Sequence, residues 1–225
     1  MEAGLKRDQE RKRTIDIIDL TRRLEDSMAV FSGHPPVSIT RHLTAGKDGR
    51  NVEKISMGGH TGTHVDVPYH FIDKGFSSEN ISLPSICGAV VLVNIAFKDG
   101  KPITVKDIQG KKEKIKTLKK LVVHAHWQQT GQSYYKDYPT LSADACEWLC
   151  DLNIEMLGMD TPSPGPFGQK GDEIHKRLLR ENIYIIEGLT NLDRIKEDTF
   201  LLVCLPLSIK AMGGVPCRAI AITSI

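Results

Sequence analysis

The sequence predicts an α/β fold in which a largely buried mixed sheet forms the core of one compact domain. Three observations indicate this class. Strand-like segments outnumber helix-like ones, the second half of the chain alternates helix with strand, and residues 88–96 (GAVVLVNIA) form an unbroken apolar run of strand length. Such a run is typical of a strand buried on both faces. No linker divides the 225 residues, so we expect one domain at 14–225 behind a charged N-terminal segment at 1–13.

The first half of the chain contains extended segments with one helix among them. Residues 14–24 are short and β-branched, which favours a strand, and residues 54–60 also have an extended pattern. Residues 104–116 have helical character, with Thr104 placed to cap the N-terminus. Residues 119–127 (KKLVVHAHW) predict a further strand.

In the second half, helices and strands alternate. Residues 141–153 predict a helix, because Ser142 is a good N-cap and apolar residues recur at helical spacing. Residues 154–160 predict a strand that ends in a loop rich in proline and glycine, TPSPGP. Residues 172–182 predict another helix. The remaining apolar segments predict three strands, at 183–189, 199–207 and 217–223.

Composition and charge exclude several classes of partner. Charged residues make up 26% of the chain and the formal net charge is +2, a balance that implies neither a nucleic-acid nor a membrane partner. The N-terminus, MEAGLKRDQERKR, is charged and no apolar stretch follows it, so it is not a signal peptide. No run approaches the roughly 18 apolar residues that a membrane span needs. We therefore expect a cytoplasmic protein that acts on a small molecule.

Residues 59–71 (GHTGTHVDVPYHF) concentrate three histidines and an aspartate. These four, His60, His64, Asp66 and His70, all have even numbers, and same-parity side chains of an extended chain project to one face. Four residues of straight strand span about 13 Å, whereas a metal–imidazole bond is only about 2 Å long. A shared ion therefore requires the chain to bend, and Gly62 permits a bend. The sequence predicts a strand that curls into a loop around an ion.

Two imidazoles and a carboxylate are suited to Zn²⁺, and also to Mn²⁺ or Fe²⁺. Three protein ligands leave a position open for water, whose pKa falls to about 7 on Zn²⁺. His70 is then a candidate general base, because neutral imidazole accepts a proton near physiological pH. The alternative interpretation is that these histidines are structural residues in a glycine-rich turn.

The stretch HTGTHVDVPYHF resembles the HxGTHxDxPxH signature of the metal-dependent cyclase-like hydrolase family, which includes the bacterial-type kynurenine formamidases and the isatin hydrolases. The resemblance extends from about Ile15 to Ile225 and includes LNIEMLGMDTPSPGP and EIHKRLLRENIYIIEGLTNL. It implies a barrel-like mixed sheet flanked by helices, of the swivelling β/β/α type. It also implies a homo-oligomer, a dimer or tetramer, in which neighbouring subunits help to close the substrate pocket.

The resemblance also implies a larger set of metal ligands, drawn from two distant parts of the chain. The ligands it implies are His60, His64, Asp66, His175 and Glu187, holding one ion or two adjacent ions, with Zn²⁺ first and Mn²⁺ as the alternative. Asp66 and Glu187 would bridge two ions, and His70 would act as general acid and base. Glu187 follows the apolar run IYII, where burying a carboxylate costs several kcal/mol unless a cation compensates it.

The chain departs from the family pattern in its opening loop. The family commonly has GDPP there, whereas this chain has GHPP with His34. Phe31 stands where formamidases usually have Trp, which keeps an aromatic plane for an aryl substrate. We expect Phe31, Trp127 and Ser163 to contact the substrate.

The roles of three further residues are left open by the sequence. His124 and His126 share parity on one strand, so a competing metal site is conceivable, although no third ligand lies near them in sequence, and His126 is otherwise a pocket-lining candidate. Asp160 supports either the site or the fold.

The function implied by the resemblance is hydrolysis of a small amide by a metal-dependent enzyme. The aryl formamide N-formylkynurenine, which yields kynurenine and formate in tryptophan catabolism, is the first candidate substrate. Ring-opening hydrolysis of a cyclic amide such as isatin is the alternative. A metal-stabilised binding protein without turnover is the hypothesis from a different class, and a closed metal site would favour it.

Overall fold

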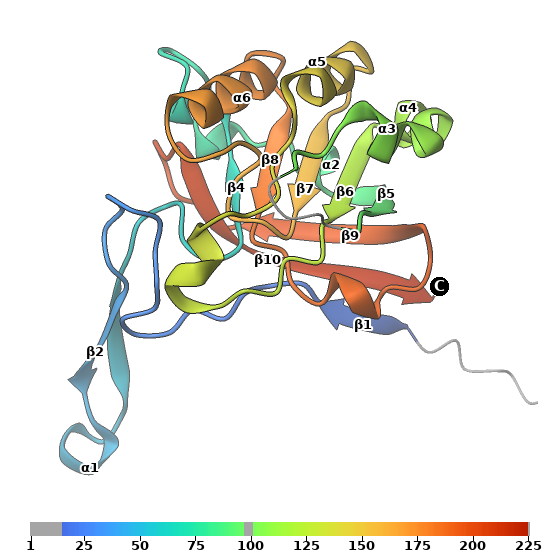
Figure 1. The fold of residues 1–225 in the computed structure, drawn as a ribbon. Coiled ribbons are helices and arrows are strands. Elements are labelled where there is room, and N and C mark those ends of the chain that lie inside the picture. The colour runs from blue at the N-terminus through green and yellow to red at the C-terminus, as the bar shows by residue number, and fades with distance from the viewer. Residues whose placement is uncertain (1–14, 97–100, 225) are drawn as a thin grey trace, which may run out of the picture.

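The computed structural model describes residues 15–96 and 101–224 (Figure 1). The predicted charged segment at 1–13 lies outside the described residues. The described strands are β1 (Asp16–Asp19), β2 (Ser38–Leu43), β3 (Val52–Ser56), β4 (His64–Asp66), β5 (Gly88–Asn94), β6 (Lys120–His124), β7 (Met156–Met159), β8 (Tyr184–Glu187), β9 (Thr199–Pro206) and β10 (Gly214–Ser224). The described α-helices are α1 (Ala45–Asp48), α2 (Leu83–Ile86), α3 (Val105–Ile108), α4 (Lys112–Leu118), α5 (Ala143–Asp151) and α6 (Gln169–Arg180).

The main sheet is mixed and closes into a barrel. Its strand order is β1-β10-β4-β8-β7-β6-β5-β9, and β9 also pairs with β10, so the strands from β10 to β9 form a closed ring with β1 outside it. The neighbours β5, β6, β7 and β8 run parallel, while β4, β9 and β10 pair antiparallel. The predicted α/β class with a barrel-like mixed sheet is confirmed.

Each parallel connection passes through helix, because parallel neighbours need a long crossover. Helices α3 and α4 join β5 to β6, α5 joins β6 to β7, and α6 joins β7 to β8. Figure 1 shows these helices together on the outer face of the parallel strands. The barrel therefore has a helix-covered side formed by its parallel half.

The parallel strands are buried on both faces, as the apolar run at 88–96 predicted. Val91 and Val93 of β5 pack into the cluster under the helices, which includes Leu149 of α5 and Leu178 of α6. The alternate residues of β5, Val90 and Leu92, pack into the barrel interior. Because side chains alternate along a strand, one continuous apolar run supplies both cores.

The helix caps bear out the sequence analysis, but the boundaries differ. The Ser142 side chain accepts a hydrogen bond from the Ala145 N–H, and Thr104 forms a capping box with Asp107. The helix expected at 104–116 is divided into α3, a 3-10 turn at Gln109–Lys111, and α4. Gly110 lies at this division, where a glycine weakens an α-helix.

A two-stranded hairpin, β2 with β3, departs from the prediction. β2 was not expected, and the extended segment expected at 54–60 ends at Ser56 instead of leading directly into the histidines. The hairpin is joined through α1 and extends away from the barrel (Figure 1). Ile55 is 58% exposed and Val52 is 37% exposed. Since neither face packs on the core, the hairpin lacks the alternating pattern by which a half-buried strand is found.

None of the described helices is long and apolar enough to cross a membrane.

Candidate metal centre

The loop before β4 turns back on itself at Gly62, as the sequence analysis predicted. Gly62 has φ +65°, in the left-handed region that glycine adopts without strain, and a Cβ there would lie 2.7 Å from Leu24 Cδ2. Thr63 then fixes the start of β4, because its hydroxyl donates to the Gly188 carbonyl and accepts from the Arg22 N–H, both at 2.7 Å. The turn brings His60 back over the strand that carries His64 and Asp66.

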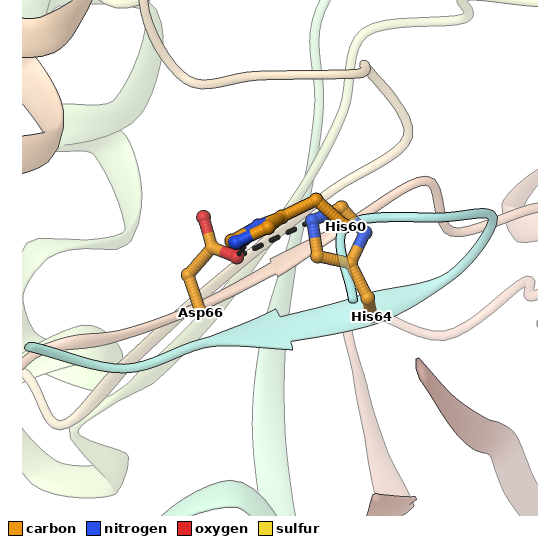
Figure 2. Close-up of side chains that lie close together, drawn as sticks. All are labelled: His60, His64 and Asp66. Atoms are coloured by element: carbon orange, nitrogen blue, oxygen red, sulfur yellow. Dashed lines mark ion pairs between the residues drawn. The ribbon is translucent and has the colours of Figure 1, made fainter. Parts of the chain in front are cut away.

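β4 and β8 place two groups of opposite charge face to face. In their antiparallel register His64 is paired with Glu187, and His64 Nε2 lies 3.3 Å from Glu187 Oε2. Asp66, two residues along β4 on the same face, has Oδ1 3.3 Å from His64 Nε2 and 2.8 Å from His60 Nδ1. Figure 2 shows the three side chains of His60, His64 and Asp66 converging over β4.

Helix α6 adds His175 from the other side of the centre. Its Nε2 lies 3.1 Å from Glu187 Oε1 and 3.8 Å from Asp66 Oδ2. His175 is buried with Leu178 and Ile174 on the inner face of the helix, so this histidine is not a solvated surface residue. The late helix and strand therefore supply the second half of the cluster.

His70 reaches the same centre through a 3-10 helix, Pro68–His70, and not through a strand. Pro68 stands at the start of that helix, where its missing N–H costs nothing. The His70 ring lies with its centroid 3.8 Å from that of His60 and 5.9 Å from that of His175. Burial lowers the pKa of His70 to about 4, despite the opposing Asp66 charge. Its imidazole is therefore neutral near pH 7.

Backbone carbonyls orient two of the imidazoles. His64 Nδ1 lies 3.1 Å from the Gly62 carbonyl, and His175 Nδ1 lies 3.0 Å from the Gly171 carbonyl. A carbonyl can only accept, so each Nδ1 carries the proton and each Nε2 faces the carboxylates. This is the outer-shell arrangement that metal-bound histidines commonly have.

The electrostatics favour positive charge between the two carboxylates. Burial would lower the pKa of His64, but Asp66 and Glu187 outweigh burial and raise it well above its usual value. Burial likewise opposes the ionised form of Asp66, yet the imidazoles around it hold its pKa well below the usual range. The pKa of Glu187 is also lowered, through His175 and His64, against burial.

Unpartnered atoms at the centre show that a cation fits it. Within the described residues, His64 Nε2 and both carboxylate oxygens of Asp66 are buried and face one another and the His60 ring at 2.8–3.3 Å, but none of them makes a well-directed hydrogen bond. Such atoms are costly to leave unsatisfied. Two groups of side chains bring ligand atoms within 4.8 Å of one another, namely His60, His64 and Asp66, and Asp66, His70 and His175. A divalent ion would satisfy the orphaned acceptors, and the nitrogen and oxygen donors suit Zn²⁺ or Mn²⁺.

The centre lies in an open cavity of about 150 Å³. Phe31 and Ser163, two of the residues expected to contact substrate, line this cavity. So does His34, whose pKa is lowered by burial and by the nearby His60. Such a cavity above imidazoles and carboxylates is typical of an enzyme that works with a bound divalent ion.

Trp127 lies elsewhere, contrary to the expectation that it contacts the substrate. It lines a separate cavity with His124 and Asp160, and its Nε1–H donates to the Tyr134 carbonyl at 2.9 Å. β6 ends at His124, and the chain turns at His126, which has φ +57°. The turn is held by Asp160, whose two carboxylate oxygens accept from the N–H groups of Ala125 and Trp127. Asp160 thus supports the fold.

His124 is buried, and its Nδ1 lies 2.9 Å from Asn94 Oδ1. Two groups of side chains among the described residues could hold a metal ion, and neither includes His124 or His126.

Several cavity residues escaped the sequence analysis: Phe71, Tyr134, Tyr135 and Asp172. Tyr134 and Tyr135 lie in a 3-10 helix, Gly131–Tyr135, in a polar connection whose position cannot be inferred from spacing. Asp172 had a usable signal, because it precedes His175 by three residues on one predicted helix and so shares its face.

Residues 18–166 match the family described as "Putative cyclase". The match spans more than half of the chain, and the chain therefore belongs to this family. A kynurenine formamidase of Bacillus cytotoxicus is 28% identical over 204 residues, covering 90% of this chain and 95% of that protein. A kynurenine formamidase of Bacillus cereus is 28% identical over 213 residues, covering 92% and 98%.

Solved structures share the fold. Isatin hydrolase A from Labrenzia aggregata, bound to benzyl benzoate, superposes with a TM-score of 0.81 at 24% identity, covering 94% of each chain. A protein described as a potential metal-dependent hydrolase with cyclase activity gives a TM-score of 0.72 at 24% identity, covering 93% of this chain and 98% of that one. The names of these relatives, with the family match, support a hydrolase.

Proposed function

We propose that this protein is a metal-dependent hydrolase of aryl formamides, with N-formylkynurenine as the first candidate substrate. The observation that carries the proposal is the gathering of His64, Asp66, His175 and Glu187, with unpartnered ligand atoms, at the base of an open cavity. The kynurenine formamidases that resemble the chain over nine-tenths of its length support the choice of substrate.

His60, His64, Asp66, His175 and Glu187 would hold the metal. We propose Zn²⁺, with Mn²⁺ as the alternative. Asp66 and Glu187 each present two oxygens to different imidazoles, so both carboxylates would hold the metal together with these rings. When bound, the metal supplies a Lewis acid that polarises the substrate carbonyl and lowers the pKa of water.

The remaining steps belong to side chains of this protein. His70 stands beside His60 and faces the cavity, so it can take a proton from the attacking water and deliver it to the leaving nitrogen. Water adds to the formyl carbon, the carbon–nitrogen bond breaks, and the aryl amine and formate are released. The substrate ring would lie between the aromatic side chains of Phe31, Phe71 and Tyr135.

We also propose that the protein acts as a homodimer or tetramer. A two-stranded hairpin is marginally stable alone, yet β2 and β3 extend from the barrel with Ile55 58% exposed. A second copy packed against this hairpin would bury that surface. Light scattering after gel filtration should give a dimer or tetramer mass, and a monomer would contradict this proposal.

The function is tested by a substrate screen on protein that has been stripped with a chelator and reloaded with Zn²⁺ or Mn²⁺. We expect metal-dependent release of formate from N-formylkynurenine, with little opening of isatin. If isatin is hydrolysed faster than N-formylkynurenine, the substrate is a cyclic amide and not an aryl formamide. Metal binding with no turnover of either compound would indicate a binding protein. His70→Ala should retain metal and lose activity by about 100-fold or more.

A further inference from the structure

Asp172 places a negative charge in the wall of the cavity, outside the proposed metal ligands. It lies in the first turn of α6, three residues before His175, so the two side chains project from the same face of the helix. Both residues line the cavity, and Asp172 is half-buried. The carboxylate is therefore next to the space where the substrate lies.

The Asp172 side chain is not committed to a protein partner. Within the described residues, no ion pair or side-chain hydrogen bond includes it. The neighbouring Glu173, by contrast, is paired with Lys176 at 3.0 Å on the solvent side of the helix. An acidic residue in the first turn of a helix interacts favourably with the helix dipole, whichever way its side chain points. The dipole alone therefore does not require Asp172 to face the cavity.

Aromatic residues of the same cavity add a second preference for positive charge. Phe31, Phe71 and Tyr135 line the same cavity, and the faces of aromatic rings attract cations. A carboxylate and aromatic rings around a partly enclosed space select a ligand with an apolar ring and a cationic group.

We propose that Asp172 is a specificity-determining residue that binds a protonated amino group of the substrate. This inference rests on the proposed aryl formamide activity and deepens it. N-formylkynurenine carries an ammonium group on its side chain at neutral pH, whereas isatin carries no cation. Asp172 thus favours amino-acid formamides over neutral aryl amides and over isatin.

The test compares N-formylkynurenine with its deamino analogue, in which hydrogen replaces the ammonium group. Steady-state kcat/KM is measured for both compounds with the wild type, Asp172→Asn and the matched control Glu173→Gln, all loaded with the same metal. We expect the wild type and Glu173→Gln to prefer the ammonium compound by about 10-fold or more, since a charge-assisted hydrogen bond is lost without it. Asp172→Asn should reduce this preference about 10-fold, and its metal content should match that of the wild type.

Each other outcome decides against the proposal. Equal kcat/KM for the two compounds with the wild type overturns it and leaves the formamidase activity standing. A preference that persists in Asp172→Asn also overturns it, and loss of metal from that variant would make Asp172 a ligand instead. If the wild type hydrolyses neither compound, the proposed function fails as well. Asp172→Ser serves as the second variant if circular dichroism shows that Asp172→Asn does not fold.

Discussion

His64 and Glu187 stand directly opposite each other on adjacent antiparallel strands, with His64 Nε2 3.3 Å from Glu187 Oε2. The two residues are separated by most of the chain, and the register of β4 with β8 brings them together. A slip of one residue would turn one of them to the other face of the sheet. The register of these two strands therefore aligns the two halves of the centre.

Glu187→Gln should strongly weaken metal binding while leaving the fold intact. The amide keeps the shape of the carboxylate but loses the charge that lies between His64 and His175. We expect metal affinity and activity each to fall by about 100-fold or more. Competition with a metal-sensitive dye measures the affinity. Glu173→Gln, an exposed substitution of the same type, should behave as the wild type, and equal loss in both variants would contradict this assignment.

Gly62→Ala should destabilise the protein and misplace His60. A left-handed backbone costs an alanine about 1–2 kcal/mol, and the added Cβ would meet Leu24 Cδ2 at 2.7 Å. We expect the free energy of unfolding in urea to drop by about 1–3 kcal/mol, together with weaker metal binding. Gly46→Ala is the control, because a Cβ at this exposed position of α1 meets nothing within 4 Å. If both variants are equally stable, the turn does not need a glycine.

Asp160 should make stability depend on pH in a known direction. Burial raises its pKa to about 6, although the N–H groups of Ala125 and Trp127 favour its ionised form. The folded state therefore holds a proton that the unfolded state releases near pH 4. This stabilising contribution is fully present below about pH 4 and is lost as pH rises through 6.

The comparison with Asp160→Asn isolates that contribution. Between pH 4.5 and 7, the unfolding free energy of the wild type relative to the variant should fall by on the order of 2 kcal/mol. The side-chain NH2 of the Asp160→Asn variant cannot accept one of the two backbone hydrogen bonds. This loss lowers the unfolding free energy of the variant by an amount that does not depend on pH. Urea titrations at the two pH values measure the difference. A difference that stays constant or rises with pH would show that Asp160 is not the group responsible.

Removing the metal should lower the melting temperature. An ion that binds the folded state at a free concentration 1,000 times its Kd adds about 4 kcal/mol of stability. We expect a chelator to lower the melting temperature of the wild type and added Zn²⁺ or Mn²⁺ to restore it. His64→Ala should show little response to either treatment. A chelator response of equal size in that variant would place the stabilising ion elsewhere.

The fold class and half of the centre could be predicted from local patterns. The apolar run around Val91 predicted a strand buried on both faces. The shared parity of His60, His64 and Asp66, with a bend at Gly62 between the two histidines, predicted the convergence of these three side chains. These inferences succeeded because period-two alternation and glycine flexibility act within a few residues.

The other half depends on contacts between distant segments. Spacing alone gives no reason to place His175 beside His64, and only the family resemblance pointed to it. Glu187 had a signal of its own, because a carboxylate after the apolar run IYII needs a compensating cation, but that signal did not name His64 as its neighbour. Trp127 was expected at the substrate because the family's matching strand ends close to the site, but in the structure β6 ends at His124 and the chain turns before it reaches Trp127. Asp160, which holds the turn after His124, directly follows a different strand, β7. The hairpin was missed because its first strand, β2, is not buried on either face and so lacks the alternating pattern of a half-buried strand.

Anomalous diffraction from crystals of protein purified without chelator tests the central claim most directly. The account predicts an anomalous peak within metal–ligand distance of His64 Nε2 and the carboxylates of Asp66 and Glu187, in a position open to the cavity. Crystals soaked in Zn²⁺ or Mn²⁺ that show no peak at this position would contradict it.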